Sequence, residues 1–409
     1  MASAIWYITK YFSPKTENSL GGRDWFLVNE MAKKGHNVTV ITSDSNIFSD
    51  IPYKLKERLK IDTYDQLSIY WLKTIKYKVP KSFLRIISWF HFELNLLFLN
   101  KKKLKKPDVI IVSSLSLLTI INGLFLKKKY KCKLIFEIRD IWPLTILEEG
   151  NFSKYNPFVQ FLSLIEYIGY RYSDAIVGMM PNLIEHVENI VGYKPLVKCI
   201  PIGFDESILN NTCKISDDYI NHYFDESYFN VVHAGTIGIT NALDVFFKAA
   251  AEMINQDKSI RFILVGDGAL KQMYMERFSH LDNIVFAPKV PRKMVRSVLE
   301  KADIVYFSTF DSKVWKYGQS LNKVVDYMLS GKLIVASYSG YPSMINESEC
   351  GYFIPPDNVE ALVNKLIEIK KLGKNEVNRI GLKGRQWIIN NRRYDKLAND
   401  YLDFISSIK

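Results

Sequence analysis

Two similar stretches decide the fold, "YFNVVHAG" (Tyr228–Gly235) and "SIRFILVGDG" (Ser259–Gly268). Each is a short run of consecutive apolar residues that ends at glycine, and helix-like sequence separates the two. Apolar runs without alternation are typical of strands buried on both faces, as in parallel sheets covered by helices. The two stretches therefore predict consecutive β-α units of a Rossmann-like domain.

The same alternation runs through the whole chain of 409 residues, which is too long for one ordinary core. Further strand-like runs are "AIWYIT" (4–9), "NVTVIT" (37–42), "DVIIVS" (108–113), "CKLIFEI" (132–138), "AIVGM" (175–179), "NIVFAPKV" (283–290), "ADIVYFS" (302–308) and "KLIVAS" (332–337). We expect an α/β protein with two tandem Rossmann-like domains and parallel sheets, with an inter-domain cleft. The expected domains are residues 1–200 and 201–392, and residues 393–409 are expected to form a helix that crosses back to the first domain.

The net charge of +12 is concentrated in the N-terminal half. Residues 1–200 contain 29 Lys and Arg against 18 Asp and Glu, whereas the remaining residues contain 26 against 25. A basic domain favours a polyanionic partner, which leaves nucleic acid, anionic lipid or a phosphorylated substrate. The Lys and Arg lack a nucleic-acid reading motif and interleaved aromatic platforms, so a non-catalytic nucleic-acid-binding protein is the weakest of these hypotheses.

Four widely spaced cysteines form neither a zinc set nor a disulfide framework, which fits a reducing cytoplasm. The N-terminus has no basic region followed by a long apolar run, so we expect no signal peptide. The apolar, aromatic stretch 78–106 ends in a Lys cluster and is either an interfacial membrane helix or a core helix with a solvated end. The uncharged stretch Val109–Leu126 has the length of a membrane span, but its Ser, Thr and Asn residues favour a buried strand followed by a helix.

Ligands of open α/β sheets bind at the carboxyl ends of the strands, so we expect the functional residues in the motifs that follow the strands. The turns "HAGTIG" (His233–Gly238) and "VGDG" (Val265–Gly268) would present backbone N–H groups to phosphate or sugar oxygens. The alternative is that their glycines only allow tight turns. Neither turn matches a dinucleotide fingerprint or a Walker A loop.

A third motif, "YGQSLNKVVDYMLSGK" (Tyr317–Lys332), follows another strand and predicts a helix from about Leu321, with Ser320 as its N-cap. Lys323 in the first turn is electrostatically unfavourable unless an anion binds there, because a helix N-terminus is itself partly positive. We therefore expect Lys323 to bind a diphosphate and Asp326 to accept hydrogen bonds from hydroxyl groups.

These residues resemble family-4 glycosyltransferases of the GT-B fold over nearly the whole chain. The resemblance rests on "YFSP…GG" after the first strand, on "VGDG", on "YGxSxNKxxDYMxxGK" and on "EIRDIWP" (Glu137–Pro143). The last motif is similar to N-acetylfucosamine-type transferases of bacterial O-antigen and capsule assembly. The resemblance implies retaining sugar transfer from a nucleotide sugar, commonly UDP-linked, without a required metal or other cofactor.

By resemblance, Lys323 is the diphosphate ligand, Asp326 the ribose ligand, and "FAPKV" lines the nucleobase pocket. The residues expected at the donor site are Gly21, Gly22, His233, Gly235, Thr236, Gly266, Asp267, Gly268, Pro288, Lys289, Val290, Tyr317, Gly318, Ser320, Asn322, Lys323 and Asp326. The catalytic candidates are Asp140, Arg139 and Lys323. Asp140 would orient or deprotonate the acceptor hydroxyl, and Arg139 would contact substrate or hold Asp140. The alternative is a structural Arg–Asp pair.

Two features depart from the family pattern. Many members have a Glu eight residues before the acid at Asp326, where this chain has Gly318. Many also have an Arg after the first Gly of the C-terminal domain and a Lys soon after it, whereas "GTIGITNALD" has Thr236 and no Lys. The diphosphate would then depend on Lys323, with Lys313 or Lys316 as possible helpers.

The leading hypothesis is a transferase on the cytoplasmic face of the inner membrane. It would act on a polyprenyl-diphosphate-linked saccharide in lipopolysaccharide O-antigen or capsule synthesis, with its basic N-terminal domain on the anionic membrane. The alternative is a nucleotide-sugar epimerase of the same fold, which would not need such a surface.

Overall fold

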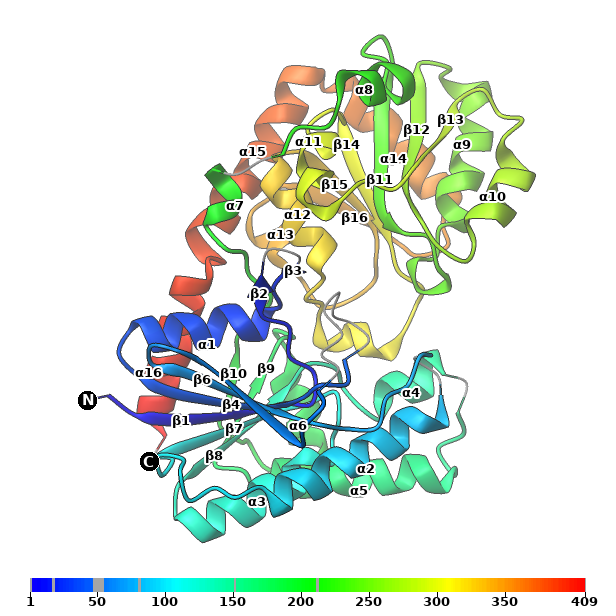
Figure 1. The fold of residues 1–409 in the computed structure, drawn as a ribbon. Coiled ribbons are helices and arrows are strands. Elements are labelled where there is room, and N and C mark those ends of the chain that lie inside the picture. The colour runs from blue at the N-terminus through cyan, green and yellow to red at the C-terminus, as the bar shows by residue number, and fades with distance from the viewer. Residues whose placement is uncertain are drawn as a thin grey trace. The chain divides into compact units, whose positions relative to one another are not determined.

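The computed structural model describes residues 2–16, 19–46, 55–79, 82–150, 152–210 and 213–408. The chain forms two compact units (Figure 1). The N-terminal unit comprises Met1–Gly203 and Tyr394–Lys409, and the C-terminal unit comprises Phe204–Arg393. The expected boundaries at residues 200 and 392 lie close to these, and each unit is a Rossmann-like α/β domain with its own sheet.

The N-terminal unit is built on an eight-stranded sheet in the order β10-β9-β8-β7-β1-β4-β6-β5. Its strands pair in parallel except at the β5 edge, which pairs antiparallel with β6. The strands are β1 (Ala4–Ile8), β4 (Asn37–Ser43), β5 (Leu59–Tyr64), β6 (Leu67–Leu72), β7 (Val109–Ser113), β8 (Lys133–Ile138), β9 (Ala175–Gly178) and β10 (Val197–Cys199), and a separate hairpin pairs β2 (Lys15–Thr16) with β3 (Ser19–Leu20). Strand order reverses between β1 and β7, which makes the carboxyl ends of these two strands the expected ligand position.

Helices cover both faces of this sheet (Figure 1). Helix α1 (Arg23–Lys33) and the C-terminal helix α16 (Tyr394–Ser407) pack together on one face, where the rings of Phe26 and Tyr394 stack at 4.9 Å. The other face carries α2 (Phe83–Phe98), α3 (Thr119–Tyr130), α5 (Pro157–Tyr172) and α6 (Leu183–Val191), and the short α4 (Leu144–Glu149) follows β8. The stretch Val109–Leu126 is therefore a strand followed by most of a helix, as its polar residues indicated. None of the described helices is long and apolar enough to cross a membrane.

The C-terminal unit has a fully parallel sheet in the order β13-β12-β11-β14-β15-β16. Its strands are β11 (Phe229–Thr236), β12 (Ile260–Asp267), β13 (Ile284–Ala287), β14 (Ile304–Ser308), β15 (Leu333–Ser337) and β16 (Gly351–Ile354). In chain order this is the 3-2-1-4-5-6 arrangement of the doubly wound fold, with the reversal between β11 and β14. The strand predictions in this half are confirmed, because apolar residues on both faces require helices on both sides.

The helices of this unit again form two layers (Figure 1). One layer contains α9 (Asp244–Gln256), α10 (Lys271–Phe278) and α14 (Val359–Lys371), and their apolar residues share a core with the strands. The other contains α11 (Val295–Leu299) and α12 (Asn322–Ser330). The remaining helices are α7 (Ser207–Asn210), α8 (Asp217–Tyr223), α13 (Met344–Glu347), α15 (Lys374–Asn391) and the 3-10 turns η1 (Ile239–Asn241), η2 (Arg292–Met294) and η3 (Lys313–Tyr317).

Candidate active site

At the reversal point of the C-terminal sheet, the pairing of the two central strands stops before their carboxyl ends, which leaves an opening in the ladder between them. The β11–β14 ladder pairs Val231 with Ile304 and Val232 with Val305, and both strands continue beyond these pairs. On its other side, β11 stays paired with β12 as far as Thr236 and Asp267. The end of β11 therefore parts from β14, and His233 and the turn that follows β11 lie at this position.

Lys323 and Asn241 connect the two elements that border this opening. The Lys323 ammonium in the first turn of α12 donates a hydrogen bond to the Asn241 side-chain oxygen in η1. The Asn241 amide in turn donates to the Thr236 carbonyl at 2.9 Å, and its own carbonyl accepts from the Ser308 hydroxyl at 2.6 Å. Asn241 thus holds Lys323, the end of β11 and the end of β14 together.

The position of Lys323 makes its charge costly in the unliganded protein. Burial lowers the pKa of Lys323 to about 8. The side chain also stands at a helix N-terminus, whose partial positive charge disfavours a cation. Helix α12 begins at Asn322 with Leu321 in the N-cap position, so the prediction that Ser320 caps it is wrong. The N-cap residue Leu321 makes no side-chain hydrogen bond to this first turn. The backbone N–H groups at the start of a helix, together with Lys323, suit an anion.

His233 contributes a neutral hydrogen-bond acceptor to the same opening. It is fully buried, and its Nδ1 bonds to the Tyr306 carbonyl at 3.1 Å. Burial and then the charge of Lys323 lower the pKa of His233 to about 3, so the ring is neutral at physiological pH. Because Nδ1 must carry the proton toward a carbonyl, Nε2 is an acceptor. Nε2 has no hydrogen-bond partner among the described residues, and a Cβ added to Gly235 would lie 3.5 Å from it.

Tyr327 fixes helix α12 against β11. Its hydroxyl donates to the Ala234 carbonyl at 3.1 Å and accepts from the Ala234 N–H at 3.0 Å. The preceding residue, Asp326, is half-buried, and burial raises the pKa of its carboxyl against the opposing charge of Arg292 in η2. Asp326 therefore lies one turn beyond Lys323 and within electrostatic reach of the loop after β13, where the resemblance places the nucleobase pocket.

The ends of β12 and β13 are tied together by lysines. Lys271 donates to the Gly266 carbonyl at 2.9 Å and to the Ala287 carbonyl at 3.2 Å. Lys289 lies 3.7 Å from the Asp267 carboxylate, and both side chains are exposed. The Pro288 carbonyl accepts from the Tyr219 hydroxyl at 2.8 Å, and Val290 follows in the same loop. Lys271 was not among the residues singled out from the sequence.

Three glycines of the expected donor site are explained by the backbone. Gly266 and Gly268 have φ of +150° and +159°, and a Cβ there would lie 1.9 Å from the Gly235 carbonyl oxygen and 2.3 Å from that of Ile237. Glycine is therefore required at both positions, because another backbone segment lies too close for a side chain. Gly318, after η3 and Tyr317, has φ of +97°, which disfavours the Glu found there in many family members. Lys313 and Lys316 lie within η3 itself.

In the N-terminal unit, considered by itself, Asp140 follows β8. Its carboxyl is half-buried, and among the described residues it forms no ion pair or side-chain hydrogen bond. Burial raises the pKa of Asp140 against the lowering effects of Arg139 and Arg85. A carboxylate with a raised pKa at a strand end suits a general base.

Arg139 does not hold Asp140. Its guanidinium pairs with Asp24 in the first turn of α1 at 2.6 Å, and its backbone N–H donates to the Ser114 hydroxyl at 3.0 Å. The structural pair considered from the sequence is therefore present, but its acid is Asp24, 115 positions away. No short motif contains Asp24 and Arg139 together, so the sequence carried no signal for this contact.

Behind Arg139 lies a buried network around Glu137. Glu137 Oε1 accepts from the Tyr7 hydroxyl at 2.6 Å and the Ser113 hydroxyl at 2.8 Å, and Arg23 Nη1 lies 3.2 Å away. Burial opposes its ionisation, but Arg23 and the two hydroxyls outweigh burial and lower the pKa of Glu137. The "EIRD" motif thus joins β8 to α1 through Glu137 and Arg139, and neither of the two forms an ion pair or hydrogen bond with the Asp140 carboxyl in the described part of the chain.

Gly21 and Gly22 form the turn that begins α1. Gly21 has φ of +77°, and a Cβ there would lie 3.1 Å from that of Lys15. The N–H of Gly22, the N-cap residue, donates to the Ser13 carbonyl at 2.7 Å. The positive φ explains Gly21 locally, whereas a Cβ at Gly22 would lie 3.5 Å from that of Ser13 and would fit.

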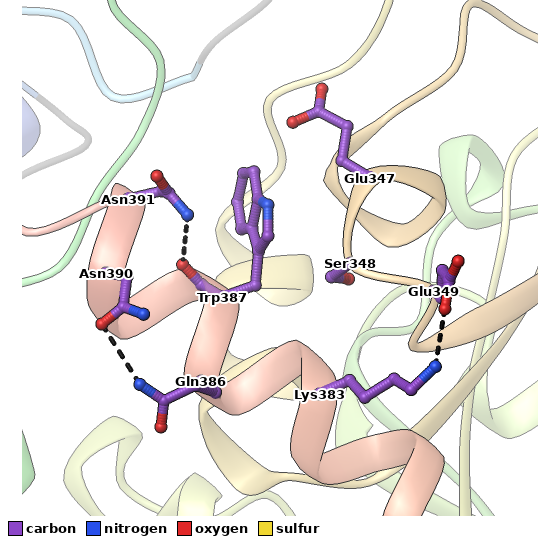
Figure 2. A pocket seen from close by; sticks show the side chains of 8 residues that line it. All are labelled: Glu347, Ser348, Glu349, Lys383, Gln386, Trp387, Asn390 and Asn391. Atoms are coloured by element: carbon purple, nitrogen blue, oxygen red, sulfur yellow. Dashed lines mark hydrogen bonds and ion pairs between the residues drawn. The ribbon is translucent and has the colours of Figure 1, made fainter.

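Figure 2 shows a pocket of about 470 Å³ elsewhere in the C-terminal unit. Its lining comes from α13, α15 and the residues before β16, at the amino end of that strand. Lys383 pairs with Glu349 at 2.6 Å, and Gln386 donates to Asn390 at 3.2 Å. Because this pocket lies at the amino end of β16 and not at the carboxyl ends of the strands, it is not the candidate site.

The comparisons with known proteins agree with this architecture. Residues 228–371, which contain the opening, match the family described as "Glycosyl transferases group 1". Sucrose-phosphate synthase from Thermosynechococcus elongatus is similar in structure over 99% of this chain and 98% of its own, with 12% identity and a TM-score of 0.69. No curated protein matches the sequence significantly.

Two further solved structures contain nucleotides. Anabaena Alr3699/HepE in complex with UDP has 14% identity, covers 99% of this chain and 100% of its own, and has a TM-score of 0.64. The structure described as trehalose-6-phosphate from E. coli bound with UDP-2-fluoro glucose has 10% identity, covers both chains fully and has a TM-score of 0.73. At these identities the similarity shows the fold. The chain has the GT-B fold, and residues 228–371 of its C-terminal unit match the group 1 glycosyltransferase family.

Proposed function

We propose that the protein is a retaining glycosyltransferase that takes a sugar from a UDP-sugar bound in the C-terminal unit. The observation that carries this proposal is the half-buried Lys323, held by Asn241 beside neutral His233 at the reversal point of a group 1 glycosyltransferase domain. The nucleotides named with structures of the same fold support the choice of donor.

The proposed chemistry follows from the charge of the site. As the bond between sugar and diphosphate breaks, negative charge grows on the diphosphate, and Lys323 with the first-turn N–H groups of α12 would stabilise it. His233 Nε2 would accept a hydrogen bond from a sugar hydroxyl, and Asp326 one from the ribose. In retaining transfer, the leaving diphosphate can itself assist the incoming hydroxyl, so this proposal requires no metal.

The acceptor would bind in the N-terminal unit, with its hydroxyl at Asp140. We place a polyprenyl-diphosphate-linked saccharide there, an intermediate of bacterial O-antigen or capsule synthesis. The transferred sugar would be an N-acetylated hexosamine or deoxyhexosamine, as the "EIRDIWP" resemblance implies.

The surface of helices α2, α3 and α5 supports association with the cytoplasmic face of the inner membrane. These helices lie next to one another on one side of the N-terminal sheet (Figure 1). Helix α2 buries Trp89 and Phe92 yet exposes Phe83 by 73% and Phe98 by 80%. Further exposed apolar residues are Leu84, Phe90, Leu94 and Leu97 of α2, Ile121 and Phe125 of α3, and Phe161, Leu164 and Tyr167 of α5. The exposed Lys102, Lys103, Lys128 and Lys129 follow α2 or end α3, where they would meet anionic headgroups.

Donor binding is tested by calorimetry with UDP and a panel of UDP-sugars, followed by transfer assays with the preferred donor. The Lys323→Ala variant should lose at least tenfold in UDP affinity and more in turnover while its melting temperature stays near that of the wild type. Wild-type turnover in this variant would reject the site, and an epimerised UDP-sugar without transfer would reject the reaction in favour of the epimerase alternative.

Membrane association is tested by co-sedimentation with anionic vesicles. The variants Leu94→Glu and Phe98→Glu should reduce binding, because they place charge on the proposed apolar surface. Leu382→Glu is the matched control, since Leu382 is 54% exposed but belongs to α15 of the other unit. Equal sedimentation of all three variants and the wild type would contradict the assignment of this surface.

A further inference from the structure

Three cationic side chains gather where β1, β6 and α2 meet in the N-terminal unit, and none of them has been assigned a role above. Lys10 follows β1, Lys76 follows β6, and Arg85 belongs to the first turn of α2. Lys10 is only 1% exposed, and its ammonium donates to the Ser45 carbonyl at 3.1 Å. Its Nζ lies 4.8 Å from the centre of the Tyr11 ring.

Tyr11 lies between Lys10 and Arg85. The Arg85 guanidinium carbon is 5.8 Å from the Tyr11 ring centre, and Arg85 Nε donates to the Tyr11 hydroxyl at 3.2 Å. The same guanidinium lies 5.3 Å from the Trp89 ring and 6.0 Å from the Trp142 ring. The Arg85 guanidinium thus lies close to three aromatic rings, whose faces attract cations.

In the described part of the chain, the nearby carboxylates of Asp44 and Glu93 have other partners. Asp44 binds Lys76 at 2.6 Å and accepts from the Thr74 N–H at 2.8 Å. Glu93 accepts from Thr119 at 2.6 Å and Asn122 at 2.7 Å, and burial raises its pKa to about 7. In the described part of the chain, Lys10 has no ion pair.

The pKa of Lys10 agrees with an excess of positive charge around its ammonium group. Burial, followed by the charges of Lys76 and Arg85, lowers the pKa of Lys10 to about 7, against the weaker effects of Asp44 and Glu93. A buried ammonium without a carboxylate is unfavourable unless another anion approaches. A bound anion would offset the cost and keep Lys10 charged.

We propose that Lys10 and Arg85 bind the phosphate or diphosphate group of the acceptor substrate. This proposal rests on the proposed function and extends it by assigning a binding site to the anionic group of the acceptor. Lys10 lies at the carboxyl end of β1, next to the reversal point with β7, where a doubly wound sheet binds its ligand. Arg85 lies within electrostatic reach of Asp140, so the anion and the attacking hydroxyl would belong to one substrate.

The same helix links this site to the proposed membrane surface. Phe83 and Leu84, directly before Arg85, are 73% and 48% exposed, whereas Arg85 packs against Tyr11 and Trp89. A diphosphate ester whose lipid chain stays in the membrane would reach Arg85 along α2. This geometry favours a lipid-linked phosphate over a soluble one.

The first test measures calorimetric binding of inorganic pyrophosphate to the full chain in the Lys323→Ala background, which weakens the proposed donor site. Arg85→Gln and Lys10→Met, added to that background, should each bind pyrophosphate at least tenfold more weakly. Lys73→Gln is the matched control, because exposed Lys73 follows the same strand as Lys76. Absence of pyrophosphate binding, or unchanged affinity in both variants, would overturn the proposal.

Circular dichroism would show whether Lys10→Met folds, and the half-buried Arg85 supplies a second variant if it does not. The pyrophosphate measurement needs no turnover, so it stands even if the proposed transfer reaction fails. The second test compares acceptors that carry the same sugar on a lipid diphosphate or on a neutral alkyl chain. In the otherwise wild-type enzyme, Arg85→Gln should raise KM at least tenfold only for the diphosphate. If Arg85→Gln changed KM equally for both acceptors, or for neither acceptor, the site would be assigned to free phosphate and its role in acceptor binding would be overturned.

Discussion

The Lys323 ammonium and the Asn241 side-chain oxygen are hydrogen-bonded across the opening of the C-terminal sheet, although 82 positions separate them in the chain. The turn after β11 lacks the Lys expected from the family resemblance, and Asn241 lies in that turn. A neutral acceptor there holds the cation that α12 supplies. The positive charge at this site therefore comes from the helix, and the turn positions it.

Replacement of Asn241 by Ala should weaken UDP binding about tenfold, or about 1.4 kcal/mol. The variant keeps the charge of Lys323 but removes the group that orients it and the bond to the Thr236 carbonyl. Calorimetric titration with UDP measures the change. Asn390→Ala is the control, because Asn390 is exposed and belongs to α15, not to the elements that meet at the reversal point. Unchanged affinity in Asn241→Ala would mean that Lys323 does not depend on this contact.

UDP affinity should fall as pH rises above 8. Burial depresses the pKa of Lys323 from 10.5 to about 8 in the free protein, whereas a bound diphosphate favours the ammonium. Above pH 8 binding must therefore take up a proton, and Kd should rise by up to about tenfold per pH unit. Between pH 8 and the ordinary Lys pKa the unfolded chain binds this proton more tightly, so the same group contributes a gain in stability of the unliganded protein as pH rises. Lys323→Arg should give a flat profile over pH 7.5–9.5, and a flat wild-type profile would contradict the assignment.

Gly318→Ala should destabilise the C-terminal unit by about 1–2 kcal/mol, because a Cβ disfavours φ of +97°. Gly238→Ala is the matched control in another turn of the same unit. Its φ is −136°, and an added Cβ would have 3.8 Å to its nearest neighbour. Urea denaturation of the two variants should therefore separate them clearly. Equal stability would remove the backbone explanation for the missing Glu.

The buried pair of Arg23 and Glu137 should show strong coupling. Arg23→Gln leaves the Glu137 carboxylate buried without its cation and should cost about 3–5 kcal/mol of unfolding free energy. Glu137→Gln leaves the Arg23 guanidinium buried without the Glu137 carboxylate. The double variant should lose clearly less than the two single losses combined, because neither unpaired charge remains. Additive losses in urea denaturation would show that the 3.2 Å contact contributes little.

Much of the architecture followed from local sequence. Consecutive apolar residues in strands such as β1, β11 and β14 can be buried only in a sheet covered on both faces, which predicts the two doubly wound domains. The polar residues within 109–126 separated a strand from a helix, since such groups need hydrogen-bonding partners at a strand end. The charge of Lys323 at a helix start likewise predicts an anion site, and this stays a prediction.

Tertiary structure alone decided which partners these residues have. The sequence indicates that Lys323 and Arg139 are charged and stand after strands, but it does not show that Asn241 holds one and Asp24 the other. Long-range pairing depends on strand order, and strand order arises from the burial of whole faces, not from any short motif. The same reason applies to Lys10 and Arg85, which the order of the N-terminal strands and the packing of α2 bring to one tyrosine ring.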